Sequence, residues 1–165
     1  MSRKLEKISL KQFIKDTNLK EEDYNDYSIP KRNTKYSAGY DFANLSEFTI
    51  DKGQTKLIPT GIKADMECDE VLLLIIRSSL GFKHNIRMCN QVGVIDKDYY
   101  NNQNNEGHIF IKIKNEGEKP KTFKAHENIA QGIFIKYLTT DNEEQITQER
   151  KGGIGSTNKE SEKNE

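Results

Sequence analysis

From residue 36 onward, short apolar runs alternate with turn residues along the chain. The alternation is clearest at residues 108–114, where isoleucine fills every second position and Phe110 and Lys112 lie between. A period of two is typical of a strand with one buried face. Other runs rich in β-branched and aromatic residues cover 41–44, 47–50, 55–66, 70–77, 122–125 and 129–138. Many short strands with few helices predict an all-β fold, a jelly-roll-like barrel or sandwich.

Two segments break the β pattern and predict one or two short helices. Near the N-terminus, apolar side chains recur at close to helical spacing, at Ile8, Leu10, Phe13 and Ile14. Ser9 stands where it can cap this helix, and the polar residues 15–27 that follow are expected to be a solvated connector. Residues 79–83, which overlap the run Ser-Ser-Leu-Gly at 78–81, predict a single helical turn.

The chain divides into three parts. Residues 1–29 are predicted to hold the N-terminal helix and its connector, and residues 30–140 the β domain. Residues 141–165 form a C-terminal arm rich in Asp, Asn, Glu, Gln and Lys, with little apolar surface to bury. Such a composition predicts a mobile tail.

Composition narrows the class of protein. At 165 residues and 19.0 kDa, the chain fits one domain with short tails. Its 26 Lys+Arg balance 26 Asp+Glu, so it lacks the basic excess of proteins that bind polymeric nucleic acid. A hydrophobic fraction of 33% and a mean hydropathy of −0.87 are low for a self-sufficient monomer. These values favour polar tails, a wet central channel or a core completed by other subunits.

The sequence also predicts the cellular location of the protein and the state of its cysteines. The apolar run at 71–76 is far too short to span a membrane, and no signal-peptide pattern opens the chain, so a cytoplasmic location is expected. Cys68 and Cys89 have no partners at metal-ligand spacing and are predicted to be reduced packing residues.

Asp96, within the run Gly93-Val94-Ile95-Asp96-Lys97-Asp98-Tyr99, is the candidate base. Apolar residues precede it, which predicts a buried strand that ends at a cleft, where a carboxylate can accept a proton from water. An Asp at a strand end is more often a turn former that binds its own backbone. This run alone therefore does not establish catalysis.

Two further clusters are candidates for binding an anion. Arg77-Ser78-Ser79 follows the apolar run at 71–76, and two hydroxyls, backbone N–H groups and a guanidinium at the start of a helical turn can hold a phosphate. A serine-capped turn with a surface salt bridge is the structural alternative. The segment at 37–41, Ser-Ala-Gly-Tyr-Asp, is by itself only a glycine bend that enters a strand.

The last two clusters lie near the C-terminus. Gln131 is an amide within a predicted strand, which could simply satisfy a backbone group. Residues 150–157 combine Arg150 with glycines and two hydroxyls, a composition that can wrap an anion. They lack the Gly-Lys-Ser/Thr ending and the following helix of a Walker motif, so a P-loop is excluded.

In this order along the chain, the five clusters resemble the five motifs of the homotrimeric dUTPases (dUTP diphosphatases), and the resemblance runs from Pro30 to Thr157. A Gram-positive or phage-type member is indicated. The resemblance implies a homotrimer of jelly-roll-like subunits whose active sites are each shared by three chains. It implies hydrolysis of dUTP to dUMP and diphosphate, with Mg²⁺ held mainly by the substrate phosphates and water.

The resemblance also implies a role for each matching residue. Asp96 would be the base that activates water. Asn90 and the backbone of Val94 and Ile95 would form a hairpin that hydrogen-bonds uracil, and Tyr99 would lie beneath the deoxyribose and exclude a 2′-hydroxyl. The implied substrate-binding residues are Asp41, Arg77, Ser78, Ser79, Asn90, Gly93, Val94, Ile95, Tyr99, Gln131, Arg150, Ile154, Gly155, Ser156 and Thr157.

The chain departs from the family pattern at three places. The run at 101–105 delays the glycine that usually follows the tyrosine, which predicts a lengthened hairpin tip. Gly132 stands where a larger apolar residue is common. In the arm, Ile154 replaces an aromatic ring and Arg150 lies one residue closer to the glycines than usual.

Two alternative functions remain open from the sequence. A dCTP deaminase-like nucleotide enzyme shares the fold and the triphosphate grip, although Asn90 and the Gly-Val-Ile-Asp run favour uracil hydrolysis. A phage-type dUTPase with an added regulatory protein partner would use the N-terminal helix or the insert at 101–105 as its contact surface.

Overall fold

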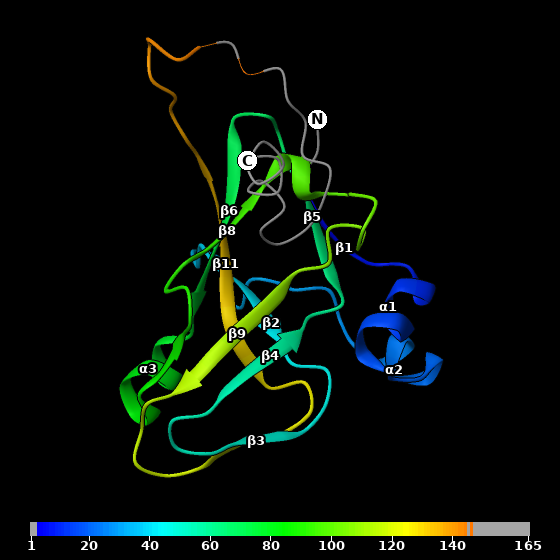
Figure 1. Ribbon diagram of the computed structural model, residues 1–165, viewed down its shortest axis with the longest axis vertical. Helices are drawn as coiled ribbons and strands as arrows, with labels where there is room; N and C mark the ends of the chain where they lie inside the picture. Colours follow the sequence, from blue (N-terminus) through cyan, green and yellow to red (C-terminus); the bar gives the residue numbers. More distant parts are fainter. Residues whose placement is uncertain (1–2, 145, 147–165) are drawn as a thin grey trace, which may run out of the picture.

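The computed structural model describes residues 3–144 and residue 146 (Figure 1). The described strands are β1 Lys4–Lys7, β2 Tyr40–Ala43, β3 Phe48–Ile50, β4 Thr55–Pro59, β5 Ile62–Asp65, β6 Glu70–Ile76, β7 Ile86–Met88, β8 Gly93–Asp96, β9 Phe110–Asn115, β10 Lys121–Phe123 and β11 Asn128–Lys136. The helices are α1 Leu10–Thr17, α2 Glu21–Asp26 and α3 Ser78–His84, with a 3₁₀ turn, η1, at Lys97–Tyr99. None of the described helices is long and apolar enough to cross a membrane.

The core lies between two antiparallel sheets. One has the strand order β2-β11-β6-β8 and the other β4-β9-β7, and in Figure 1 β9 and β4 cross in front of β11 and β2. Buried side chains from both sheets meet in one cluster, among them Phe42, Leu72 and Leu74 from the first sheet and Ile58, Ile111 and Ile113 from the second. Two strand pairs, β1-β5 and β3-β10, complete the described β structure. The predicted all-β fold is confirmed.

The strand pattern is confirmed in most places, but it is corrected at 55–66, and β7 lies in none of the predicted runs. The isoleucines at 109, 111 and 113 are fully buried, whereas Lys112 is exposed. The predicted strand at 55–66 is instead two strands, β4 and β5. The break falls at Gly61, whose φ of +72° suits glycine and whose N–H donates to Nε2 of His108 at 2.8 Å.

The N-terminal segment adds a strand that the sequence did not predict. β1 pairs with β5 in antiparallel register, although its sequence, Lys-Leu-Glu-Lys, is mostly charged and shows little apolar signal. The helix that follows it is confirmed: Ser9 caps α1 by accepting a hydrogen bond from the Gln12 N–H at 3.2 Å.

The segment at 15–27, predicted to be a solvated connector, is partly helical and partly buried. It contains α2, and Tyr27 is only 5% exposed because its ring stacks on Phe13, with 5.4 Å between the ring centroids. The Tyr27 hydroxyl also donates to the Gly61 carbonyl at 2.8 Å. The prediction was wrong here because α2 has no apolar period, and Tyr27, which directly follows it, is buried only by tertiary contacts.

Both cysteines are free thiols, but only one is even partly buried. Cys89 is half-buried, whereas Cys68 is exposed in the turn between β5 and β6. The prediction that Cys68 is a packing residue is therefore wrong, because a thiol in this turn has no core beneath it to fill.

Gly132 departs from the family pattern for a steric reason. It lies on β11, paired with Tyr40 on β2 and with Leu74 on β6. A Cβ atom at this position would lie 2.8 Å from Cε2 of Phe42 and 3.0 Å from Cδ1 of Leu72. These two side chains already fill the space that a larger residue would occupy.

We predict that Gly132→Ala lowers the free energy of unfolding by about 1–3 kcal/mol, because the added methyl group overpacks the core. Gly81→Ala is the matched control. A Cβ there meets only ordinary contacts, the nearest being the Ile86 carbonyl oxygen at 3.8 Å, and Gly81 lies within α3. The control should stabilise the protein by about 0.5–1 kcal/mol. Urea unfolding at one fixed protein concentration measures both, and equal midpoints for Gly132→Ala and the wild type would contradict the steric account.

Candidate active site

Asp41 and Arg77, from the first and second sequence clusters, lie side by side. Nε of Arg77 is 3.5 Å from Oδ1 of Asp41, and the Asp41 side chain is 12% exposed against 36% for Arg77. Oδ2 of Asp41 accepts hydrogen bonds from the amide of Asn33 and, at 3.4 Å, from that of Asn128. The carboxylate is thus fixed from two sides, while the guanidinium remains partly open to solvent.

Gln131, from the fourth cluster, joins this pair. It lies opposite Asp41 on β2 and opposite Ile75 on β6. A Cβ atom at Gly39 would lie only 2.3 Å from Oε1 of Gln131, so glycine is required there by the close approach of the glutamine side chain. Three sequence clusters therefore meet at one end of the four-stranded sheet.

The helical turn predicted at 79–83 is confirmed and slightly longer, as α3. Arg77 is its N-cap residue, and its backbone N–H donates to the Ile129 carbonyl at 3.1 Å, which ties the start of α3 to β11. Ser78 and Ser79 in the first turn are exposed. The guanidinium and the two hydroxyls are therefore presented together to solvent, as an anion site requires.

Asp96 lies at the other end of the same sheet. It is half-buried as the last residue of β8, and it faces Val71 across the β6-β8 pair. The expectation that β8 is a buried strand is wrong for Val94, which is 59% exposed, and for Val92 just before the strand, which is 40% exposed. Val94 is exposed because it lies on the opposite face of β8 from Gly93 and Ile95, and Val92 lies in the turn before the strand.

Asn90 lies in a tight turn rather than in a hairpin. The Val92 N–H donates to the Asn90 carbonyl at 2.6 Å, and Gln91 between them has a φ of +64°. β7 before this turn pairs with β9, and β8 after it pairs with β6. The predicted hairpin is therefore corrected to a turn that joins strands of two different sheets.

Gly93 and Tyr99 are both enclosed. A Cβ atom at Gly93 would lie 3.1 Å from Cβ of Leu74, so the glycine allows β8 to approach β6 closely. Tyr99 lies in η1 with 4% exposure, and its hydroxyl donates to the His108 carbonyl at 2.8 Å. Ile95 between them is half-buried opposite Leu72.

The candidate base and the candidate phosphate grip are far apart within one chain. Asp96 faces Val71 at the start of β6, whereas Arg77 directly follows its end, so their backbones are separated by about 20 Å at about 3.3 Å per residue. Figure 1 shows α3 at one end of β6 and β8 and the chain leaving β8 at the other. A cavity of ≈ 330 Å³ is lined by Asp41 with Asn33 and Asn128, but neither it nor a second cavity of ≈ 750 Å³ is lined by Asp96 or Arg77. A single chain therefore does not assemble the predicted site.

The glycine-rich fifth cluster lies outside the described residues. This applies to Arg150, Ile154, Gly155, Ser156 and Thr157.

Several polar residues that hold the site were missed by sequence reasoning. Asn33 and Asn128 bind the Asp41 carboxylate, and Asn105 binds the Tyr99 hydroxyl. Asn33 and Asn105 lie in loops, where asparagine normally indicates a turn, and Asn128 begins β11, so the residue type gave no signal of these contacts.

Comparison with known proteins identifies the family of this chain. The sequence model of the dUTPase family matches residues 25–158. A deoxyuridine 5'-triphosphate nucleotidohydrolase of Lactococcus lactis is 46% identical over 131 residues, which cover 79% of this chain and 87% of the relative. One from Haemophilus influenzae is 33% identical over 142 residues, covering 82% and 90%. The crystal structure of dUTPase from Streptococcus mutans superposes with a TM-score of 0.68 at 40% identity, covering 84% of this chain and 98% of that one.

Proposed function

The chain belongs to the dUTPase family and hydrolyses dUTP to dUMP and diphosphate, and from this premise we propose that Asp96 is the catalytic base. Asp96 orients a water molecule and takes its proton as the water oxygen attacks the α-phosphorus in line. The new bond is from the water oxygen to phosphorus, and the bond from phosphorus to the bridging oxygen breaks, so diphosphate leaves. The half-buried position of Asp96, at a strand end continued by η1, supports a fixed direction for the carboxylate.

The phosphates are held at the other end of the sheet. Arg77, Ser78 and Ser79 supply a guanidinium and two exposed hydroxyls, which can neutralise and bind the charge that grows on the leaving diphosphate. Asp41 holds the Arg77 side chain at 3.5 Å, and Gln131 beside it can donate from its amide. The pairing of these clusters in one corner of the fold supports a single function for all of them.

The nucleoside is held by the turn and strand around Asp96. Asn90 and the exposed backbone at Val94 and Ile95 provide the polar groups that recognise uracil, with Gly93 allowing the close approach of the strands. The ring of Tyr99 supports the deoxyribose and leaves no room for a 2′-hydroxyl. Enclosure of that ring, at 4% exposure, supports a rigid wall.

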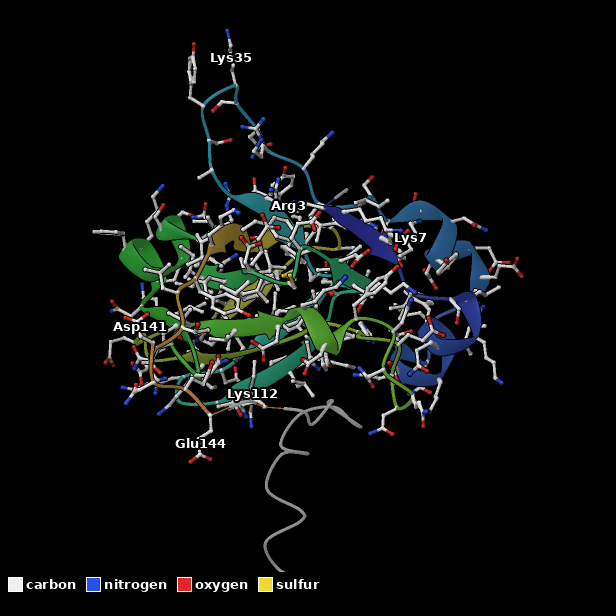
Figure 2. All side chains as sticks on the ribbon, turned by 90° about the horizontal axis from the view of Figure 1, so that it is seen from above. Arg3, Lys7, Lys35, Lys112, Asp141 and Glu144 are labelled. Carbon is white, nitrogen blue, oxygen red and sulfur yellow. The ribbon has the colours of Figure 1, made fainter. Side chains whose placement is uncertain are left out.

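A homotrimer brings the two halves together, with Asp96 from one chain and Arg77 from a neighbour. The separation of about 20 Å within one chain supports this sharing. Exposed aromatic side chains near the phosphate grip support subunit contacts, since Phe82 on α3 is 90% exposed and Tyr36 is 88% exposed. Figure 2 shows the segment that carries Lys35, next to Tyr36, projecting from the body of the molecule on the side away from Lys112.

Mg²⁺ is the metal that this site fits. Among the described residues, no group of three His, Cys, Asp or Glu side chains is arranged to hold a metal ion. Asp41 is a single carboxylate at the phosphate grip, and Mg²⁺ is usually bound by one or two carboxylates together with substrate phosphates and water. When bound, the ion neutralises phosphate charge and fixes the phosphate conformation. Asp41 would hold it through water.

The C-terminal arm, residues 141–165, completes the site. Its segment with Arg150, Ile154, Gly155, Ser156 and Thr157 would cover the nucleotide of a neighbouring chain, since glycine N–H groups and hydroxyls suit phosphates and Ile154 suits the base by apolar contact. We also retain a cytoplasmic location as part of this proposal.

Asp96→Asn should lower kcat for dUTP by about 10²–10⁴-fold, because an amide cannot take the proton from water. Binding of an imido analogue of dUTP, measured by calorimetry, should change little, because the shape of the side chain is kept. Asp98→Asn is the matched control, since Asp98 is exposed two residues further on, and its turnover should stay near that of the wild type. Wild-type turnover in Asp96→Asn would show that another group is the base.

Sharing of sites can be tested by subunit complementation. Asp96→Asn and Arg77→Ala should each be nearly inactive alone. If each site takes Asp96 and Arg77 from different chains, random co-assembly in equal amounts restores about a quarter of the sites, because one chain of each type then completes a site. Co-expressed variants with different affinity tags allow mixed oligomers to be purified and assayed. Activity no higher than that of the single variants would mean that both residues come from one chain.

A further inference from the structure

The insert at 101–105, which lengthens the chain after Tyr99, is folded inward onto that tyrosine. Nδ2 of Asn105 donates to the Tyr99 hydroxyl at 2.8 Å, and the same hydroxyl donates to the His108 carbonyl at 2.8 Å. Nδ2 of Asn102 donates to the Tyr99 backbone carbonyl, also at 2.8 Å. The tyrosine is therefore held at both its ends, by the side chain oxygen and by the main chain.

The insert is ordered by its own hydrogen bonds. Asn102 is only 8% exposed, and its Oδ1 accepts from the backbone N–H groups of Asn104 and Asn105 at 3.0 and 3.2 Å. Oδ1 of Asn105 accepts from Nδ2 of Asn102 at 2.8 Å and from the Gly107 N–H at 3.2 Å. A Cβ atom at Gly107 would lie 2.6 Å from the Tyr99 carbonyl oxygen, so the loop closes directly on the tyrosine backbone. Asn105 is thus preset to donate to the hydroxyl.

The N-terminal segment holds this loop from outside. The Ser9 hydroxyl and N–H donate to the Glu106 carboxylate at 2.5 and 2.9 Å. Oδ2 of Asp16 on α1 lies 2.6 Å from Nδ1 of His108, the residue whose carbonyl binds the Tyr99 hydroxyl. Burial lowers the pKa of His108, so the ring is neutral at pH 7, and because Nε2 accepts from Gly61, Nδ1 donates to Asp16.

We propose that Asn105 is a positioning residue for Tyr99, and that through it the insert sets the discrimination of this enzyme between deoxyribonucleotides and ribonucleotides. The inference rests on the proposed function, in which the Tyr99 ring lies against the sugar. A ring excludes a 2′-hydroxyl only if the ring cannot be displaced by contact with that hydroxyl. The hydrogen bond from Asn105 to the ring hydroxyl resists that displacement, at the point on the ring furthest from the backbone.

A role in stability alone would not require this geometry. The loop could close through its backbone and the bonds between Asn102 and Asn105 without reaching the Tyr99 side chain. The donor is instead directed at the ring hydroxyl, within a set of bonds that fixes both donor and acceptor. The side chains of Asn102 and Asn105 therefore form hydrogen bonds within this chain.

The test measures kcat/KM for dUTP and for UTP, with Mg²⁺ present, in the full-length enzyme. Asn105→Ala should lower the ratio of kcat/KM for dUTP to kcat/KM for UTP about 5–10-fold, which is the effect expected for one buried hydrogen bond. Asn104→Ala is the matched control in the same loop, because Asn104 is exposed and contributes its backbone N–H. Its ratio should stay within about twofold of the wild type.

Tyr99→Phe removes the same hydrogen bond from the other partner and leaves Asn105 bound to Asn102 and Gly107. It should lower the ratio at least as much, because it also removes the hydrogen bond from the Tyr99 hydroxyl to the His108 carbonyl. Adding Asn105→Ala to it should change the ratio little further, because the bond between the two side chains is already absent. Circular dichroism melting identifies which variants are folded. If Asn105→Ala does not fold, Tyr99→Phe alone tests the role of the hydrogen bond.

The outcomes separate this inference from the proposed function. If the wild type selects dUTP over UTP but a folded Asn105→Ala or Tyr99→Phe keeps the same ratio, the positioning role is overturned and the proposed function stands. Fully additive effects of the two changes would also overturn it. A wild type that does not select dUTP over UTP would overturn both.

Discussion

The pairing of β6 with both β8 and β11 is the constraint on which the site depends. Register across these three strands places Gln131 and the start of α3 at one end of β6 and Asp96 at the other. Because an extended strand cannot shorten, the base and the phosphate grip stay apart in any single chain. With the roles proposed for Asp96 and Arg77, hydrolysis of dUTP would need an assembly in which each subunit supplies two half-sites.

Each half-site is held by contacts that involve no substrate. Asp41 is bound by Arg77 and by two asparagines, and Tyr99 is bound by Asn105 and the His108 carbonyl. Groups fixed in this way lose little further freedom when nucleotide binds, which favours rapid assembly of a reactive geometry. The N-terminal segment extends this support, since β1 pairs with β5 and α1 reaches His108 through Asp16.

The sequence predicted the fold class and the order of the motifs well, because both depend on local signals. The alternating isoleucines of β9, the Ser9 cap and the helical turn after Arg77 are all local, and all are confirmed. Contacts between distant segments could not be predicted in this way. Burial of Tyr27 against Phe13 depends on how separate elements pack. The exposure of Val94 likewise depends on which face of β8 packs against other elements.

The most direct test of the shared site is a crystal structure of the assembled protein with Mg²⁺ and a non-hydrolysable imido analogue of dUTP. The account predicts a water molecule hydrogen-bonded to the Asp96 carboxylate and in line with the α-phosphorus, while Arg77 of a neighbouring chain contacts the phosphates. A nucleotide bound remote from Asp96 with no water between them, or held by Asp96 and Arg77 of one chain, would contradict it.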